Sequence, residues 1–215
     1  YLLKCREDRV PGELGWFGIW PRSRDFEGLQ LDEIEYLMAR SLAHDAPISL
    51  QTTFRQLDAH PLTPGILEIV RAYETLRMAG AVPADVRRRL GEKGRDVVLL
   101  RRTPDAGPEF VPVEPIEAVA GETDLRACVG DSGEDAVLTL WHAIGKPGTL
   151  TLAVDPATVS ATDIFGNPMD VNAAGEKTVI PFGHRRTTVV LEGLRAENVR
   201  MKVTQASVKP AADGK

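Results

Sequence analysis

The chain has 215 residues, of which 43% are hydrophobic and 27% charged, and its formal net charge is -5. This length suits two modest domains better than a complete α/β barrel with an accessory domain. No apolar run approaches the ~20 residues of a membrane span, and the arginines are scattered, which argues against an integral membrane protein and against nucleic-acid binding.

An apolar run from Glu13 to Trp20 predicts a first buried strand, because it contains glycines, is too short for a helix and ends at Pro21. Apolar residues three and four apart then predict a helix from Leu31 to Leu42 that stops near His44-Asp45. Residues 48–54 are rich in β-formers and predict a second strand.

A second amphipathic helix is predicted from Ile66 to Leu76, entered at Thr63-Pro64 and closed by Gly80. Two buried strands joined by a helix form a βαβ crossover, which requires parallel pairing. Two strands cannot form a stable parallel sheet alone. Either further strands lie in a missing upstream segment or in another chain, or this unit packs on the downstream module. We favour the missing segment, because the opening Tyr1-Leu2-Leu3-Lys4 lacks an initiator Met and a signal-peptide pattern.

Residues 82–94 predict a helical connector, after which the pattern changes to short runs of period two separated by Gly, Pro, Asn and Asp. The expected strands are 97–100, 110–113, 125–129, 136–144, 149–154, 159–163, 177–182, 187–191 and 199–203. This spacing favours an antiparallel β-sandwich. We therefore predict domains at 1–94 and 95–208 and a disordered tail at 209–215.

Metal, disulfide and cofactor chemistry find no support in the sequence. The two cysteines, Cys5 and Cys128, fall in different predicted domains. The histidines lack the paired spacing of zinc ligands, and no phosphate-binding or dinucleotide fingerprint is present. We expect no metal and no cofactor.

The strand and turn from Val159 to Pro168, followed by Val179–Phe182 and Thr188–Gly193, resemble the C-terminal β-sandwich of many barrel glycoside hydrolases. Within it, Asp163-Ile164-Phe165-Gly166-Asn167 forms the most telling turn, since Gly166 and Asn167 both tolerate positive φ. The alternative is an ordinary hairpin of any β-domain.

The N-terminal half extends this resemblance. Gly12–Phe17, the helix containing Asp32–Leu37, and Asp45–Gln51 look like the last two β/α units of the (β/α)8 barrel in bacterial glycoside hydrolase-like proteins. The implied fold class is α/β plus all-β: the last β/α units of a TIM barrel followed by a β-sandwich. The resemblance also implies a carbohydrate partner, an extracytoplasmic or secreted location, and O-glycosyl hydrolase activity only when the missing barrel segment is joined.

Barrel enzymes build their sites from loops at the carboxyl ends of the strands. A glycoside hydrolase needs two carboxylates there, and aromatic and polar groups that hold the sugar. The candidates after the two predicted strands are Asp25 and Glu27 for catalysis, and Trp20, Arg22, Arg24 and Gln51 for substrate binding.

Each candidate has a structural alternative. Trp20 could plug the barrel rim, and Arg22 to Asp25 could form a salt-bridged loop. Gln51 and its neighbours Thr52, Thr53 and Arg55 could equally cap the next helix. His142 falls within a predicted strand, which favours a packed histidine over a catalyst. A second hypothesis, from a different class, is a non-catalytic carbohydrate-binding or structural module.

Overall fold

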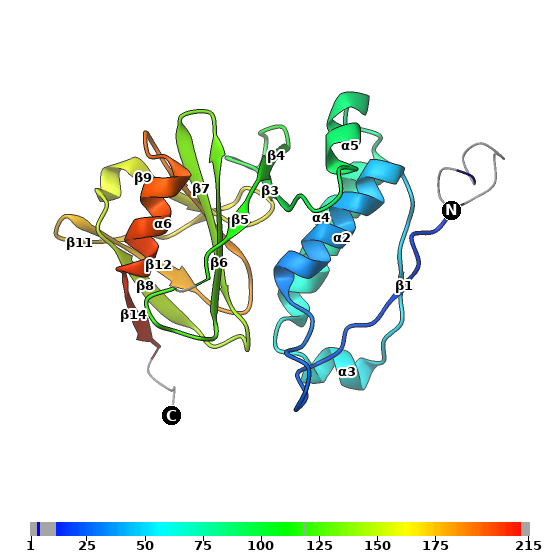
Figure 1. Cartoon of the computed structure of the whole chain (residues 1–215), viewed down its shortest axis with the longest axis horizontal. Helices are drawn as coiled ribbons and strands as arrows, with labels where there is room; N and C mark the ends of the chain where they lie inside the picture. The colour runs from blue at the N-terminus through cyan, green and yellow to red at the C-terminus, as the bar shows by residue number, and fades with distance from the viewer. Residues whose placement is uncertain (1–3, 5–11, 118, 212–215) are drawn as a thin grey trace. The chain divides into compact units, whose positions relative to one another are not determined.

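The computed structural model describes Lys4 and residues 12–117 and 119–211. The chain divides into two compact units, Tyr1–Val97 and Val98–Lys215 (Figure 1). Its architecture is mixed α/β, with sheets that are mostly antiparallel.

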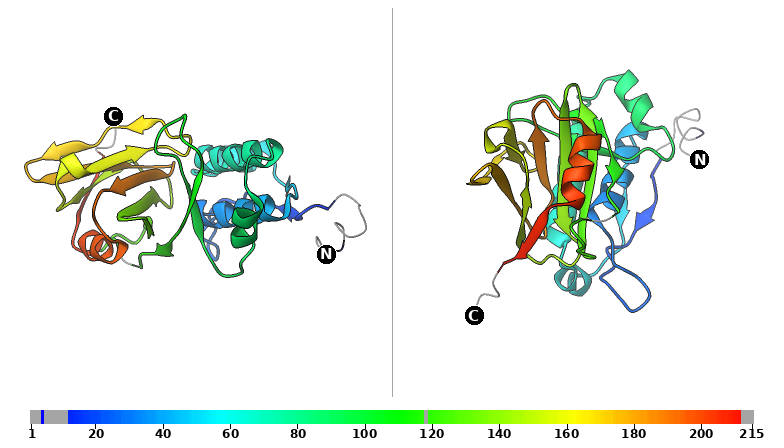
Figure 2. Two further views of the ribbon diagram at one scale, coloured as in Figure 1. Left: turned by 90° about the horizontal axis from the view of Figure 1, so that it is seen from above. Right: turned by 60° about the vertical axis from the view of Figure 1, so that its left-hand side comes forward.

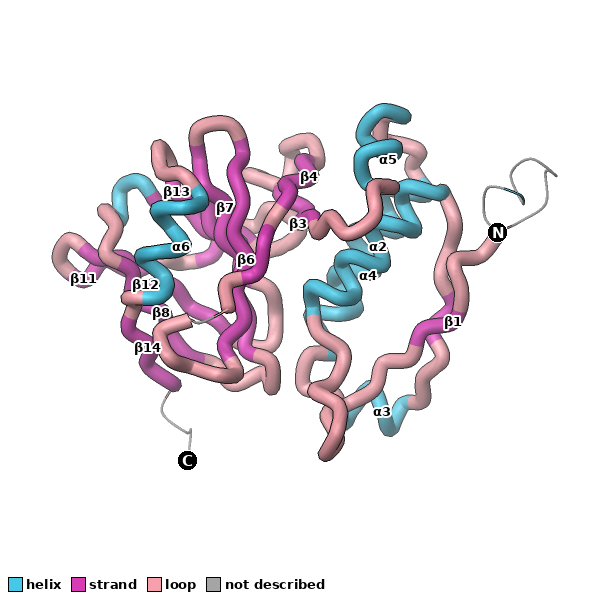
Figure 3. Tube along the Cα trace, in the orientation of Figure 1, coloured by secondary structure: helices cyan, strands magenta, loops and turns pink. Residues whose placement is uncertain are grey.

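Unit 1 is a small βαβ arrangement with additional helices (Figure 3). Its elements are β1 (Trp16–Phe17), α2 (Leu31–His44), β2 (Ser49–Leu50), α3 (Phe54–Ala59), α4 (Thr63–Met78) and α5 (Ala84–Leu90). β1 and β2 pair in parallel, with Trp16 opposite Ser49. The parallel crossover predicted from the sequence is therefore confirmed, whereas a closed barrel is not present in the described part of the chain.

The helices of unit 1 are buried along the apolar faces from which they were predicted. Ile34 and Met38 of α2 are buried, as are Ile66 and Ile69 of α4. α2 begins where Glu33 Oε2 accepts a 2.8 Å hydrogen bond from the backbone N–H of Gln30 and ends at Asp45, which adopts φ 50°. α2 and α4 pack against each other through their buried apolar residues.

Three predictions in unit 1 need correction. The strand expected from Glu13 to Trp20 is confined to Trp16–Phe17, and Trp16 is 72% exposed rather than buried. The glycines interrupt the run, and Gly15 has φ 132°. The apolar run at 48–54 ends in a helix that was not predicted, α3. Thr63 does not cap α4; its hydroxyl donates to Leu57 O at 2.6 Å.

Within the described residues, unit 2 is a β-sandwich with the helix α6 and a short 3-10 helix at Pro156–Thr158 (Figure 2). A six-stranded sheet has the order β10-β9-β13-β7-β6-β5, a four-stranded sheet has the order β11-β12-β8-β14, and β3 pairs with β4. The elements are β3 (Val97–Leu100), β4 (Glu109–Pro112), β5 (Glu114–Pro115), β6 (Leu125–Ser132), β7 (Asp135–His142), β8 (Gly148–Leu152), β9 (Val159–Thr162), β10 (Pro168–Met169), β11 (Asn172–Ala174), β12 (Lys177–Phe182), β13 (Thr187–Leu191), α6 (Ala196–Thr204) and β14 (Ser207–Pro210).

The two sheets enclose one hydrophobic core. Leu138 and Val189 of the larger sheet lie opposite each other in register, and they join Leu150 and Ile180 of the smaller sheet in that core. Residues that alternate along each strand point to the same face, so one face of the larger sheet is apolar and supplies this layer.

The C-terminal end of unit 2 differs from the prediction. Val199 and Val203 belong to the helix α6, not to a strand, and both are buried in the core. Lys209 and Pro210, which were expected in a disordered tail, lie in β14, which pairs with β8. Residues 212–215, like Cys5, lie outside the described residues.

The turn from Asp163 to Asn167 links β9 to β10, as predicted. One carboxylate oxygen of Asp163 accepts backbone N–H groups of Phe165 at 2.8 Å and Asn167 at 2.9 Å, while the other accepts the Asn167 amide at 2.7 Å. Only Gly166 uses positive φ, 84°, and Asn167 contributes its side chain instead. A Cβ on Gly166 would lie 2.4 Å from the Thr103 carbonyl, so the turn also packs tightly on a neighbouring loop.

Candidate functional site

The parallel pairing of β1 and β2 brings their carboxyl ends to one edge of unit 1. The backbone N–H of Gln51 donates to Phe17 O at 2.8 Å, which places the residue after β2 directly beside the end of β1. The Gln51 side chain is exposed. The loop that follows β1 starts from the same edge, so the predicted substrate-binding residues belong to one region, here called the β1–β2 edge (Trp20 to Leu29 and Gln51).

Trp20 of the β1–β2 edge packs its indole against the backbone of Gly18. It is 47% exposed, and its indole folds back over Gly18, where an added Cβ would lie 1.9 Å from the indole Nε1. The absence of a side chain at Gly18 therefore makes room for one part of the indole ring. The rest of the indole is open to solvent. A held, half-exposed indole offers an apolar face together with a polar N–H group.

The loop after Trp20 is closed by backbone contacts. The N–H of Leu29 donates to Trp20 O at 3.2 Å, and the N–H of Ser23 donates to Phe26 O at 2.8 Å. Within the loop, all four charged candidates are exposed: Arg22, Arg24, Asp25 and Glu27. A general acid usually gains its function from a desolvated environment. The exposure of Asp25 and Glu27 therefore favours contacts to ligand hydroxyls over proton transfer.

The segment from Gln51 to Arg55 was considered both for substrate binding and for capping the next helix. Thr53 caps α3: its Oγ1 accepts the backbone N–H of Gln56 at 3.2 Å, and the Gln56 side chain accepts the N–H of Thr53 at 2.8 Å. This is a capping box, a structural role. Arg55 is exposed within the first turn of α3. Gln51 is thus the polar residue of this segment that lies at the β1–β2 edge.

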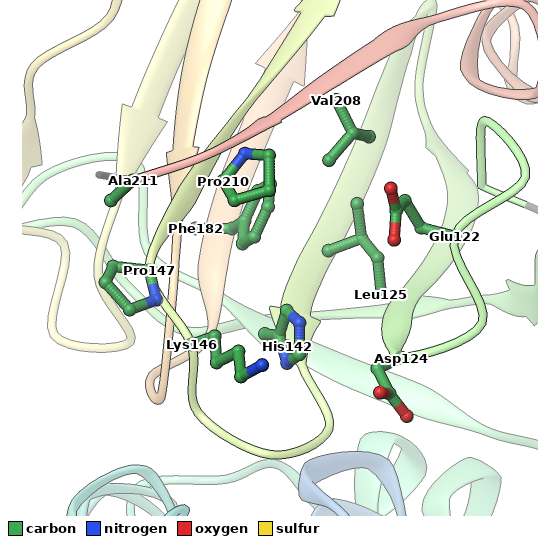
Figure 4. A pocket seen from close by; sticks show the side chains of 10 residues that line it. All are labelled: Glu122, Asp124, Leu125, His142, Lys146, Pro147, Phe182, Val208, Pro210 and Ala211. Carbon is green, nitrogen blue, oxygen red and sulfur yellow. The ribbon is translucent and has the colours of Figure 1, made fainter. Parts of the chain in front are cut away.

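Unit 2 contains a cavity of about 480 Å³ that the sequence analysis missed, here called the sandwich pocket (Figure 4). Its lining residues are Glu122, Asp124, Leu125, His142, Lys146, Pro147, Phe182, Val208, Pro210 and Ala211. His142 was expected within a strand; it is the last residue of β7 and lines the pocket. The sequence around His142 carries no local signal for the pocket, because the lining joins segments as distant as Glu122 and Ala211.

His142 is fixed in the sandwich pocket by its neighbours. Its ring stacks on Phe182, with the centroids 6.1 Å apart and the planes 24° apart. Its Nδ1 accepts the backbone N–H of Ile144 at 3.3 Å, so in the neutral ring the proton is on Nε2. Burial lowers the pKa of His142, the charge of Asp124 opposes this change, and Lys146 adds to it.

In the described part of the chain, no group of three or more His, Cys, Asp or Glu side chains is arranged to hold a metal ion. Among the described helices, none is both long enough and apolar enough to cross a bilayer.

No family model and no curated protein matches the chain. Glycoside hydrolases are among the solved structures that it resembles. They include a noncanonic maltogenic α-amylase from Thermotoga neapolitana (11% identity, TM-score 0.32, 88% of this chain and 44% of that chain) and an α-amylase from Geobacillus thermoleovorans complexed with acarbose (11%, 0.34, 84% and 39%).

A glycoside hydrolase family 30 xylanase from Clostridium acetobutylicum is also similar, at 8% identity and a TM-score of 0.28, with 86% of this chain and 43% of that chain covered. The chain thus spans less than half the length of each of these enzymes. TM-scores this low do not transfer a fold or an activity, so the function must be argued from the residues of this chain.

Proposed function

We propose that the chain is the C-terminal portion of a glycoside hydrolase-like carbohydrate-active protein, and that its β1–β2 edge contributes to saccharide binding. The observation that carries this proposal is the half-exposed indole of Trp20, held over Gly18 at the carboxyl edge of a parallel strand pair. In α/β sheets that edge is where ligands bind.

Each residue has a defined part in the proposed site. The indole of Trp20 stacks on the C–H face of a sugar ring, while Arg22 and Arg24 donate hydrogen bonds to hydroxyl or ring oxygens. Gln51 can both donate and accept. Asp25 and Glu27 accept hydrogen bonds from hydroxyl groups, and they remain the carboxylates to test for catalysis.

The strand pair itself supports a larger assembly around unit 1. β1 and β2 have two residues each, and large apolar side chains beside them face solvent: Trp16 is 72% exposed and Phe54 is 87% exposed. Parallel sheets are normally covered on both faces. We propose that additional β/α units, from the same protein or another chain, cover these residues and complete a barrel. An extracytoplasmic or secreted location is part of the same proposal.

The binding proposal can be tested by affinity electrophoresis of the chain in gels that contain soluble starch or xylan. We expect Trp20→Ala to abolish retardation of the band. Trp16→Ala, which removes another exposed tryptophan of unit 1, should preserve it. Equal retardation of wild type and Trp20→Ala would overturn the proposal.

The alternative is a non-catalytic carbohydrate-binding or structural module, and the sandwich pocket is the observation that favours it. Release of reducing sugar from starch or xylan separates the two functions. Turnover that falls in Asp25→Asn or Glu27→Gln supports an enzyme. Glycan binding that persists without turnover in the chain joined to its barrel segment supports the module.

A further inference from the structure

We propose that the sandwich pocket is a second binding site, separate from the β1–β2 edge, for a neutral saccharide of one or two rings. The choice of ligand class rests on the proposed function. The position of the site rests on unit 2 alone, because all ten lining residues belong to that unit. A cavity of about 480 Å³ is within the ~300–1,000 Å³ typical of small-molecule sites.

The walls of the pocket differ in chemistry. Phe182, Pro147 and Pro210 form an apolar side, and Glu122 and Asp124 lie across from them (Figure 4). A pyranose ring has the same division, with C–H groups on its faces and hydroxyl groups around its rim. The ring can therefore lie against the apolar side while its hydroxyls reach the carboxylates.

The apolar side is held in place by the backbone of β8. A Cβ on Gly148 would lie 2.4 Å from Cζ of Phe182, so the ring of Phe182 rests directly on the strand. The N–H of Ala211 donates to Pro147 O at 2.9 Å, which ties the end of β14 to the loop before β8. The site is thus largely preformed, which reduces the entropy lost on binding.

The polar groups supply donors as well as acceptors. Because Nδ1 of His142 is occupied by the N–H of Ile144, its Nε2–H is the group that can donate to a ligand. The ammonium of Lys146 is a second donor, and Glu122 and Asp124 accept. A hydroxyl both donates and accepts, so a polyol can use both kinds of group.

The charges of the lining favour a neutral ligand over an anion. Glu122 and Asp124 oppose the entry of an anion, and Lys146 offsets only one of their two charges. Neutral hydroxyl groups do not meet this repulsion. The charges therefore distinguish a neutral saccharide from a sugar acid.

The test is a nitrogen-15 NMR titration of the whole chain with maltose and with glucuronate, a pyranose that carries a carboxylate. The imidazole signals of His142 report on the sandwich pocket, and the indole N–H of Trp20 reports on the β1–β2 edge. We expect maltose to shift the His142 signals at lower concentration than glucuronate. The double variant Glu122→Gln/Lys146→Ala should weaken maltose binding at His142 roughly tenfold.

A matched control keeps folding separate from binding. Glu176→Gln/Lys177→Ala makes the same substitutions at two exposed residues beside the other end of β12, and it should leave the maltose affinity unchanged. Maltose shifts at Trp20 but not at His142 would overturn the pocket while supporting the proposed function. Shifts at His142 alone would support the pocket and overturn the β1–β2 edge. Tighter binding of glucuronate than of maltose at His142 would overturn the preference for a neutral ligand over an anion.

Discussion

The phenol of Tyr73 on α4 donates a 3.0 Å hydrogen bond to Oε1 of Glu35 on α2, and both side chains are buried. Tyr73→Phe keeps the ring but removes a donor from a buried carboxyl group. We expect it to lower the free energy of unfolding of unit 1 by about 1–3 kcal/mol, measured by urea denaturation. Tyr36→Phe is the control, because it keeps the ring over which Arg40 lies at 4.5 Å. Equal losses in the two variants would contradict the role of this hydrogen bond.

The helices could be predicted where an apolar stripe was long. α2 and α4 both have buried residues at spacings of three and four, and both were predicted. α6 was mistaken for a strand, although Val199 and Val203 are four apart and share one helix face. The apolar face of α6 has too few residues to show helical spacing clearly, and residues that favour strands surround it.

Burial was harder to predict than element type. The run containing Trp16 is apolar enough for a core strand, yet this residue is exposed in the described unit. Sequence gives the apolarity of a strand, while its burial depends on what covers it. The β1–β2 edge was predictable because parallel pairing fixes which ends meet. The sandwich pocket was not, because it joins segments as distant as Glu122 and Ala211.

Gly166 should be the least replaceable residue of the turn at Asp163. An alanine there must adopt φ 84°, and its Cβ would lie 2.4 Å from the Thr103 carbonyl. Gly175 has φ 66° with nothing within 4 Å of the added Cβ, so Gly175→Ala isolates the backbone strain. We expect thermal unfolding to show a loss of about 1–2 kcal/mol for Gly175→Ala and at least about 1 kcal/mol more for Gly166→Ala. Similar losses of stability in the two variants would mean that the loop at Thr103 moves away from the added Cβ with no loss of free energy.

Thr139 and Thr188 lie directly opposite each other on β7 and β13, and their hydroxyls are buried without a hydrogen-bond partner among the described residues. Replacing both with valine removes two unsatisfied polar groups at similar side-chain shape. We expect the double variant to raise the free energy of unfolding by about 1–2 kcal/mol in chemical denaturation. Thr178→Val is the control, since its Oγ1 donates to Val154 O at 3.0 Å, and it should be destabilising. A double variant less stable than wild type would show that these hydroxyls do have partners.

The final prediction concerns His60, which is buried in the connection between α3 and α4. Its Nδ1 accepts the backbone N–H of Leu62 at 3.1 Å, just before α4 begins, and a protonated ring could not accept that bond. Burial lowers the pKa of His60 below its ordinary value of 6.5. The unfolded chain therefore takes up a proton at a higher pH than the folded chain does.

The lowered pKa of His60 makes the stability of the protein depend on pH. Above the unfolded pKa of about 6.5 both states are neutral at His60, and its contribution to stability is complete. As the pH falls below that value the unfolded state is favoured, until the folded ring also protonates. We expect wild type to lose more stability between pH 8 and pH 5 than His60→Asn, which keeps a side-chain acceptor but does not titrate. Urea unfolding at several pH values measures this difference. Parallel pH profiles for the two proteins would rule out His60 as the group responsible.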